Sequence, residues 1–198
     1  MMGATSFVVL AFLVVLALWG AAVYNRLRLL RNRVENAWSQ IDAQLKRRHD
    51  LIPNLVEVAR GYMQHEASTL EAVARARSQA VQASEAVRGH TGQVQALGAL
   101  AVAEQALGSS LGRLMVVAEA YPELKADAQM QRLSEEIAST ENRIGFARQA
   151  YNDEVMAFND KASQFPDLIW ARLLGFAHMD MLQSTVSEEE RQAPRVRF

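Results

Sequence analysis

The sequence contains no cysteine, which excludes disulfides, thiolate catalysis and cysteine-ligated zinc or iron–sulfur sites. Only four prolines and ten glycines occur among 198 residues, and half of the residues are hydrophobic. The formal net charge is −1, so no basic excess indicates a nucleic-acid partner. Few helix breakers and an alanine- and leucine-rich composition predict an all-α protein.

Charged side chains are also absent from the first 25 residues. The almost purely aliphatic run from Phe7 to Val23 approaches the ~30 Å hydrocarbon core of a bilayer at 1.5 Å per residue. We therefore predict a transmembrane anchor over residues 1–25. Its membrane-facing side chains are expected to include Phe7, Leu10, Leu13, Leu16, Trp19 and Tyr24. A cleaved signal peptide is the alternative, but the basic segment that opens such peptides is missing.

The charges that flank the anchor predict its orientation. Arg26, Arg28, Arg31 and Arg33 follow the run, whereas only the chain's own amine precedes it. Because positively charged flanks stay inside the cell, we predict a single pass with the amino terminus outside and the following domain in the cytoplasm.

Apolar residues recur at steps of three and four in four segments beyond residue 25, as in amphipathic helices. The expected breaks are Pro53, the stretch "RGHTG" at 88–92, Pro122 and Pro166. Short connections favour antiparallel neighbours. The predicted fold is a single N-terminal transmembrane helix continuous with an antiparallel up-and-down four-helix bundle over residues 26–165, followed by a short amphipathic helix over 166–182 and a polar tail over 183–198.

Pro53 is expected to mark the first corner of the bundle. It lacks an amide hydrogen and collides with the carbonyl of His49 in a continuous helix, while Asp50 suits the N-cap of a second helix. The corner would then meet the stretch around Pro122 at the membrane-distal tip, where exposed loops favour partner binding. The tentative partner-binding residues are Arg47, Arg48, His49, Asp50, Pro53, Asn54, Tyr121, Pro122, Glu123 and Lys125.

The stretch "FPDLIWARLLGF" at 165–176 returns to the membrane side in this arrangement. Its apolar side chains either enter the lipid interface or cap the open end of the bundle. The residues in question are Leu168, Ile169, Trp170, Leu173, Leu174 and Phe176.

The sequence offers little chemistry. No histidine has a glutamate three positions before it, so the Glu-x-x-His pairs of a di-iron bundle are absent, and we predict no catalytic residue, metal or cofactor. Glu104 lies on a core stripe and needs a buried partner such as Arg143 or a tyrosine hydroxyl. A structural polar layer and a small-ligand site between helices are both compatible with it, and an open cavity lined by Glu104 would favour the ligand.

Several long stretches resemble one family. "YNRLRLLRNRVENAWSQIDAQLKRRHDLIPNLVEVARGY", "VAEAYPELKAD", "TENRIGFARQAYNDEVMAFN" and the closing "PRVRF" are similar to the LemA family of bacterial membrane-anchored proteins. The resemblance implies a helical bundle behind one transmembrane helix in the bacterial inner membrane, without an established enzymatic activity or cofactor. Together these observations predict a non-enzymatic scaffold or adaptor whose partners are the lipid bilayer, a membrane or cytoplasmic protein and, as a further possibility, a second copy of the chain. A membrane-tethered sensor that binds a small ligand between helices is the alternative.

Overall fold

A computed structural model describes residues 3–88 and 94–182 of the chain. All regular structure in these residues is helical, which confirms the all-α prediction. The helices are α1 (Ala4–Tyr62), α2 (Ala67–Val87), α3 (Val94–Ala118), α4 (Pro122–Ala126), α5 (Ala128–Ser163) and α6 (Asp167–Leu173). The predicted polar tail at 183–198 lies outside the described residues.

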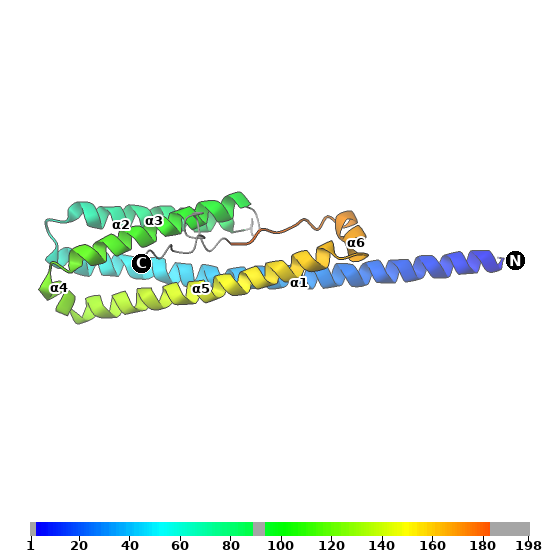
Figure 1. Ribbon diagram of the computed structural model, residues 1–198, viewed down its shortest axis with the longest axis horizontal. Helices are drawn as coiled ribbons and strands as arrows, with labels where there is room; N and C mark the ends of the chain where they lie inside the picture. Colours follow the sequence, from blue (N-terminus) through cyan, green and yellow to red (C-terminus); the bar gives the residue numbers. More distant parts are fainter. Residues whose placement is uncertain (1–2, 89–93, 183–198) are drawn as a thin grey trace, which may run out of the picture.

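Helix α1 is a single rod of 59 residues. Its amino-terminal part projects beyond the other helices in Figure 1, and its large apolar side chains from Phe7 to Leu18 are mostly exposed. This part is long and apolar enough to cross a bilayer, with a mean hydropathy of 2.6 over its most apolar window. This apolar segment and the first helix of the folded domain are therefore one element.

The predicted corner at Pro53 is wrong. Pro53 lies inside α1, nine residues before the helix ends at Tyr62. A proline at this position leaves the carbonyl of His49 without its helical amide donor. Arg77 on α2 supplies a replacement, because its Nε donates a hydrogen bond of 2.6 Å to that carbonyl. The main cost of an internal proline is thus offset by a neighbouring helix, and the chain turns at residues 63–66 instead.

The long helices pack through seams of regular spacing. The buried seam of α1 runs through Gly20, Val23, Leu27, Leu30 and Val34 in steps of three and four, which is the spacing of coiled-coil contacts. Helix α5 presents a similar seam that includes Tyr151, Val155 and Phe158. The buried side of the apolar amino-terminal segment thus continues along α1 into the protein core on the same face of the helix.

Figure 1 shows how the helices are arranged. Helix α5 packs along α1, α3 packs along α2, and α2 also contacts α1. Helix α4 lies at the end of the molecule opposite the amino terminus, and α6 lies beside α1 where α1 begins to project beyond the other helices. Among the described residues α3 has no comparable packing against α5, so one side of the helical assembly is open.

The carboxyl-terminal part of the described chain differs from the predicted amphipathic helix over 166–182. Helix α6 is confined to Asp167–Leu173, and residues 176–182 have no helical structure. Two predicted lipid-facing side chains turn inward: Trp170 lies against Gly20 of α1, and the ring of Phe176 lies 5.8 Å from that of Tyr24 and 6.2 Å from that of Phe158. Large aromatic rings that reach a helix seam pack there because they bury the most apolar area.

Candidate functional site: a groove beside a buried charged layer

A charged layer divides the protein core. The buried apolar residues form two clusters, one nearer the apolar amino-terminal segment that reaches Leu45 and Leu100, and one on the distal side that begins at Ile52 and Leu107. Between them lie Arg48 and His49 of α1, both buried, and Glu104 of α3, whose side chain is only 15% exposed. A carboxylate among apolar residues requires such partners, because a buried charge without one is strongly destabilising.

Glu104 is bound by two side chains of α1. Its Oε1 lies 2.8 Å from Nε2 of His49, and its Oε2 accepts a hydrogen bond of 3.3 Å from Nη1 of Arg48. Arg48 forms a second ion pair with Glu141 of α5, whose side chain is half exposed. The guanidinium thus joins α1, α3 and α5 at one level of the molecule. Its Nε is buried without a hydrogen-bond partner among the described residues.

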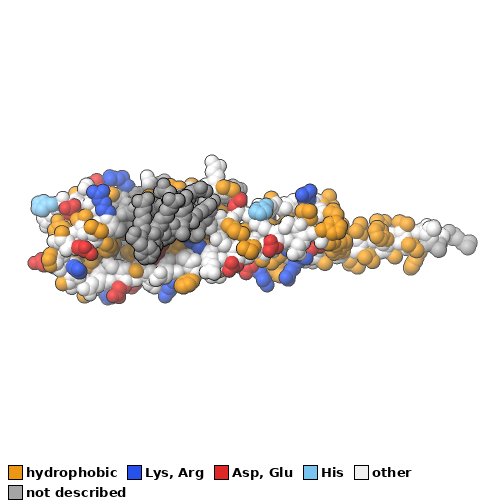
Figure 2. Space-filling model, in the orientation of Figure 1, with side chains coloured by type: hydrophobic (Ala, Val, Ile, Leu, Met, Phe, Trp, Pro, Cys, Tyr) orange, Lys and Arg blue, Asp and Glu red, His pale blue; other side chains and the backbone are white. Residues whose placement is uncertain are grey.

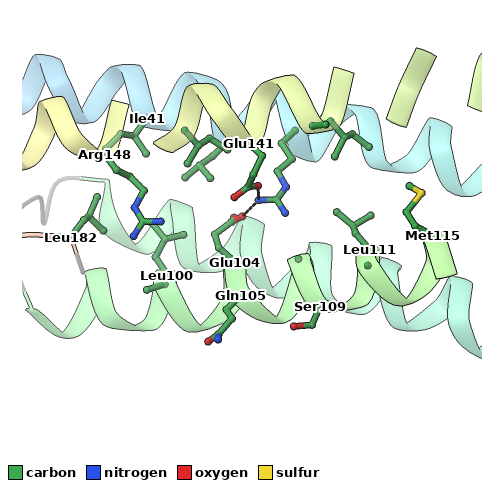
Figure 3. A pocket seen from close by; sticks show the side chains of 18 of the residues that line it. Ile41, Leu100, Glu104, Gln105, Ser109, Leu111, Met115, Glu141, Arg148 and Leu182 are labelled. Carbon is green, nitrogen blue, oxygen red and sulfur yellow. Dashed lines mark hydrogen bonds and ion pairs between the residues drawn. The ribbon is translucent and has the colours of Figure 1, made fainter. Parts of the chain in front are cut away.

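A groove opens beside this layer, between α3 and α5. Its volume is about 740 Å³, and its floor includes Ile41, Leu45 and Arg48 of α1. Figure 3 shows Glu104 and Glu141 reaching from opposite walls toward the guanidinium between them, with Leu100 and Arg148 on one side and Leu111 and Met115 on the other. The groove therefore combines apolar walls with a few convergent charges, which is the usual composition of a binding site.

The α3 wall of the groove contains a stretch of small residues. Gly108, Ser109 and Gly112 all line the groove. A Cβ added at Gly112 would meet nothing within 4 Å, so this wall faces open space rather than another helix. A bound backbone could approach it closely.

An extended segment runs along α5 and reaches the groove. Asn159 exchanges two hydrogen bonds with the backbone of Met179, of 2.8 and 3.0 Å. Asn152 does the same with Leu182, at 2.9 and 2.8 Å, and Leu182 lines the groove. The seven residues of helix from Asn152 to Asn159 rise about 10 Å, and the three residues of extended chain from Met179 to Leu182 also cover about 10 Å. The two asparagines are therefore spaced to bind the same extended segment. We call residues 176–182 the strap.

The structure separates the two stretches predicted to form the tip. Residues 47–54 lie along α1, roughly 12 to 22 Å before the end of that helix, and residues 121–125 lie at and within α4. Arg48 and His49 are buried, while Arg47 is exposed and pairs with Glu136. Asp50, Pro53, Asn54, Pro122, Glu123 and Lys125 are exposed, and Tyr121 is partly so. Partner binding by these exposed residues stays a prediction.

The end of α1 is tied instead to the start of α5. The hydroxyl of Tyr62 donates a hydrogen bond of 3.1 Å to Asp127, which also caps α5 by accepting from the amides of Gln129 and Met130. These backbone amides and the Tyr62 hydroxyl lower the pKa of Asp127, and the hydrogen bond to the carboxylate raises the pKa of Tyr62. Elsewhere in the core, burial raises the pKa of Tyr151 to about 12.

The predicted pairing of Glu104 with Arg143 is wrong. Arg143 is exposed on α5, and Arg48 and His49 take its place. These partners were not predicted, because a helix break was expected at Pro53. If the spacing of three and four is continued through the proline, from Ile41 and Leu45 to Ile52, it places residues 48 and 49 on the buried face of α1. The low exposure of Glu104 agrees with its predicted place on a core stripe. Of the two alternatives, a polar layer and a cavity lined by Glu104, the structure contains features of both.

Comparison with known proteins identifies the family. A model of the LemA family matches residues 37–198. The chain belongs to the LemA family. The match begins within α1 and covers the groove, α6 and the strap.

Curated relatives of this LemA-family chain include three magnetosome proteins. Magnetosome proteins MamQ 1 and MamQ 2 of Paramagnetospirillum magneticum are each 25% identical over 175 residues, which cover 81% of this chain and 64% of the relative. MamQ of Magnetospirillum gryphiswaldense is 23% identical over 172 residues, covering 79% and 63%. The chain thus spans a little under two thirds of these relatives. Family membership fits a membrane-associated protein, and neither the family nor these relatives are known as enzymes.

Proposed function

We propose that this protein is a non-enzymatic, membrane-anchored binding protein of the bacterial inner membrane, and that the groove between α3 and α5 binds an extended segment of a partner protein. The amino terminus lies outside, and an antiparallel four-helix bundle lies in the cytoplasm. The observation that carries the proposal is the groove of about 740 Å³ with a charged floor, on the side of the molecule where the helical assembly is open.

The membrane arrangement is supported by the two parts of α1. The exposed apolar segment needs a nonpolar environment, and the four arginines from Arg26 to Arg33 follow it directly. Positive charges of this kind are retained on the cytoplasmic side and are attracted to anionic lipids.

An extended polypeptide fits the groove in length and in form. The α3 residues that line it run from Leu100 to Met115, about 22 Å of helix, which an extended chain covers with roughly six to seven residues. The strap already shows that α5 holds an extended backbone beside this site, through Asn152 and Asn159. The small side chains of the α3 wall allow a second such backbone to approach.

Site-specific photocrosslinking in intact cells tests this proposal. A photoreactive residue at Ser109 lies in the groove, and one at Ser78, an exposed serine of α2 outside it, is the matched control. Gly112→Trp places an indole at the groove, and Gly98→Trp adds the same side chain to α3 away from it; an added Cβ meets nothing within 4 Å at either position. We expect crosslinks from Ser109 to one recurrent segment of an identified protein, lost in Gly112→Trp and kept in Gly98→Trp.

Other outcomes contradict the partner segment. Crosslinks from Ser109 that stay within this chain would show that the groove is filled by the protein itself. Capture of the same protein from Ser78, or equal capture in both tryptophan variants, would place the contact elsewhere.

A small ligand is the second candidate, because the volume of the groove lies within the range of ligand pockets and Glu104 lines it. Native mass spectrometry of the purified full chain would then show a bound small molecule that is absent from Gly112→Trp and present in Gly98→Trp. Absence of any such mass from all three proteins contradicts this candidate.

A further inference from the structure

Helix α6 carries an apolar face that no other part of the described protein covers. Phe165, Ile169 and Leu173 are 81%, 59% and 75% exposed. Ile169 and Leu173 are spaced four residues apart on α6 and therefore share one side of that helix, and Phe165 lies in the turn just before it. Figure 2 shows hydrophobic side chains gathered where the body of the molecule narrows to the span. We call these three residues the outer face of α6.

The height of α6 along the membrane helix is fixed by a close contact. A Cβ added at Gly20 would lie 2.9 Å from the ring of Trp170, so the tryptophan packs directly on the backbone of α1 at this glycine. Phe176 repeats the contact one turn later, against Tyr24. Helix α6 is therefore attached to the last turn of the apolar run, on the membrane side of Arg26.

The length of the run requires that this turn stay in the bilayer. Phe7 to Val23 spans 17 residues, or about 26 Å, which is already slightly less than the ~30 Å hydrocarbon core. If residues 20–23 were drawn out to keep α6 in water, only about 20 Å of the run would remain, and the polar Thr5 and Ser6 next to the amino terminus would have to enter the hydrocarbon core in their place. Gly20 thus lies in the membrane, and α6 lies there with it.

The charges of α6 are arranged to permit this position. Asp167 is its only acidic residue; it is buried, and it forms an ion pair of 2.5 Å with Lys161 of α5. Arg172 is exposed and has a side chain long enough to reach the headgroups from within the interface. The outer face therefore presents no carboxylate to lipid.

From these observations we infer that α6 is inserted into the cytoplasmic leaflet, with Phe165, Ile169 and Leu173 in contact with acyl chains. The protein is then held in the membrane by two elements, the span and a short helix. The short helix lies at the same depth as the end of the span, although the two are far apart in the sequence. This inference rests on the membrane anchor of the proposed function and is independent of the groove.

Fluorescence of single-cysteine variants tests the insertion, because the native chain has no cysteine to interfere. The full chain carrying Ile169→Cys or Leu173→Cys is labelled with an environment-sensitive dye and reconstituted into vesicles of phosphatidylethanolamine and phosphatidylglycerol. Quenching by lipids with nitroxide-labelled acyl chains is compared with quenching by aqueous iodide. Arg75→Cys, on the exposed side of α2, is the control for exposure to water. Leu13→Cys, in the span, is the control for exposure to lipid.

We expect the labels at Ile169 and Leu173 to be quenched by nitroxide lipids several-fold more strongly than the label at Arg75, and to be protected from iodide. If they behave like the label at Arg75 while the label at Leu13 is quenched by lipid, the insertion of α6 is refuted and the anchor stands. If the label at Leu13 is also accessible to iodide, the membrane anchor itself fails. A second readout is Ile169→Glu, which should draw the label at position 173 toward water without a change in helical content by circular dichroism.

Discussion

The hydrogen bond from Arg77 to the carbonyl of His49 explains why α1 passes through Pro53, and it leads to a quantitative prediction. Arg77→Ala leaves that carbonyl without a donor, on a residue that is only 4% exposed. Loss of a hydrogen bond that leaves a buried group unsatisfied costs about 1–3 kcal/mol. In a Pro53→Ala background, the new amide of residue 53 donates to the same carbonyl, because the helical bond from residue 53 to residue 49 is restored.

The two substitutions should therefore be coupled. We expect Arg77→Ala to lower the free energy of unfolding by about 1–3 kcal/mol in the native background and by clearly less in the Pro53→Ala background, with a coupling energy of about 1–2 kcal/mol. The measurement is denaturant unfolding of the full chain in detergent, followed by far-ultraviolet circular dichroism and tryptophan fluorescence. Trp38 is a suitable core probe because it packs against Tyr151.

The control is Arg75→Ala. Arg75 lies on the same helix but is exposed, with only a 3.4 Å contact to Glu71, so its removal should change the stability by no more than about 0.5 kcal/mol. Equal costs of Arg77→Ala in the two backgrounds would mean that the arginine does not replace the missing amide, and the explanation for the unbroken helix would fail.

Three further predictions concern the charged layer, the α5 cap and the strap. Glu104→Ala should cost about 2–3 kcal/mol in denaturant unfolding, because it leaves buried charged donors under-satisfied, whereas Glu141→Ala should cost less than about 1 kcal/mol because its carboxylate is half exposed; equal costs would contradict the difference in burial. The lowered pKa of Asp127 means that its stabilising contribution is present above the unfolded pKa of about 3.9 and is lost as the pH falls through the folded value. Asp127→Asn keeps a capping side chain but cannot titrate, so acid unfolding below about pH 4 should become less steep, and an unchanged profile would exclude this role. Asn152→Ala should speed hydrogen exchange at the amide of Leu182 and leave that of Met179 protected by Asn159; uniform exchange along the strap would show that the asparagines do not act separately.

The periodic spacing of apolar residues predicted most of the helical structure correctly. Pro122 starts α4, α5 ends just before Pro166, and the buried seam of α1 follows the predicted stripe from Leu27 to Leu45. These features depend on local conformational preferences and on which face of a helix is apolar. Both are determined by residues that are close together in the sequence.

The features that sequence reasoning missed depend on contacts between distant residues. Pro53 breaks a helix in isolation, but Arg77, on another helix, satisfies the carbonyl that the proline leaves free. The partners of Glu104 were missed for the same reason, since the assumed corner removed Arg48 and His49 from the core. The strap was missed because its backbone is held by side chains of α5 and carries no periodic signal of its own.

The contacts also indicate which helices can adjust when the groove is occupied. Helices α1 and α5 are joined at the distal end by the hydrogen bond between Tyr62 and Asp127. They are also joined through α6, because Trp170 of α6 packs on Gly20 of α1 and an ion pair links α6 to α5. Helix α3 packs less closely against α5, and the hydrogen bond that joins them in the described residues is a weak one of 3.8 Å from the hydroxyl of Ser134 to Sδ of Met115. Helix α1 also forms the groove floor and continues into the span, so a shift of α1 would have to break contacts at both ends.

A molecule that binds in the groove should therefore displace α3 more easily than α1 or α5. Glu104 is the link between α3 and the α1 floor, and Arg48 keeps a second carboxylate, Glu141, when that link opens. Separation of α3 from α5 thus leaves the buried guanidinium paired, which removes the main electrostatic penalty of the movement. Because a ligand shifts an equilibrium only through contacts that differ between two states, the α2–α3 pair, rather than the membrane span, is the element whose position binding should change.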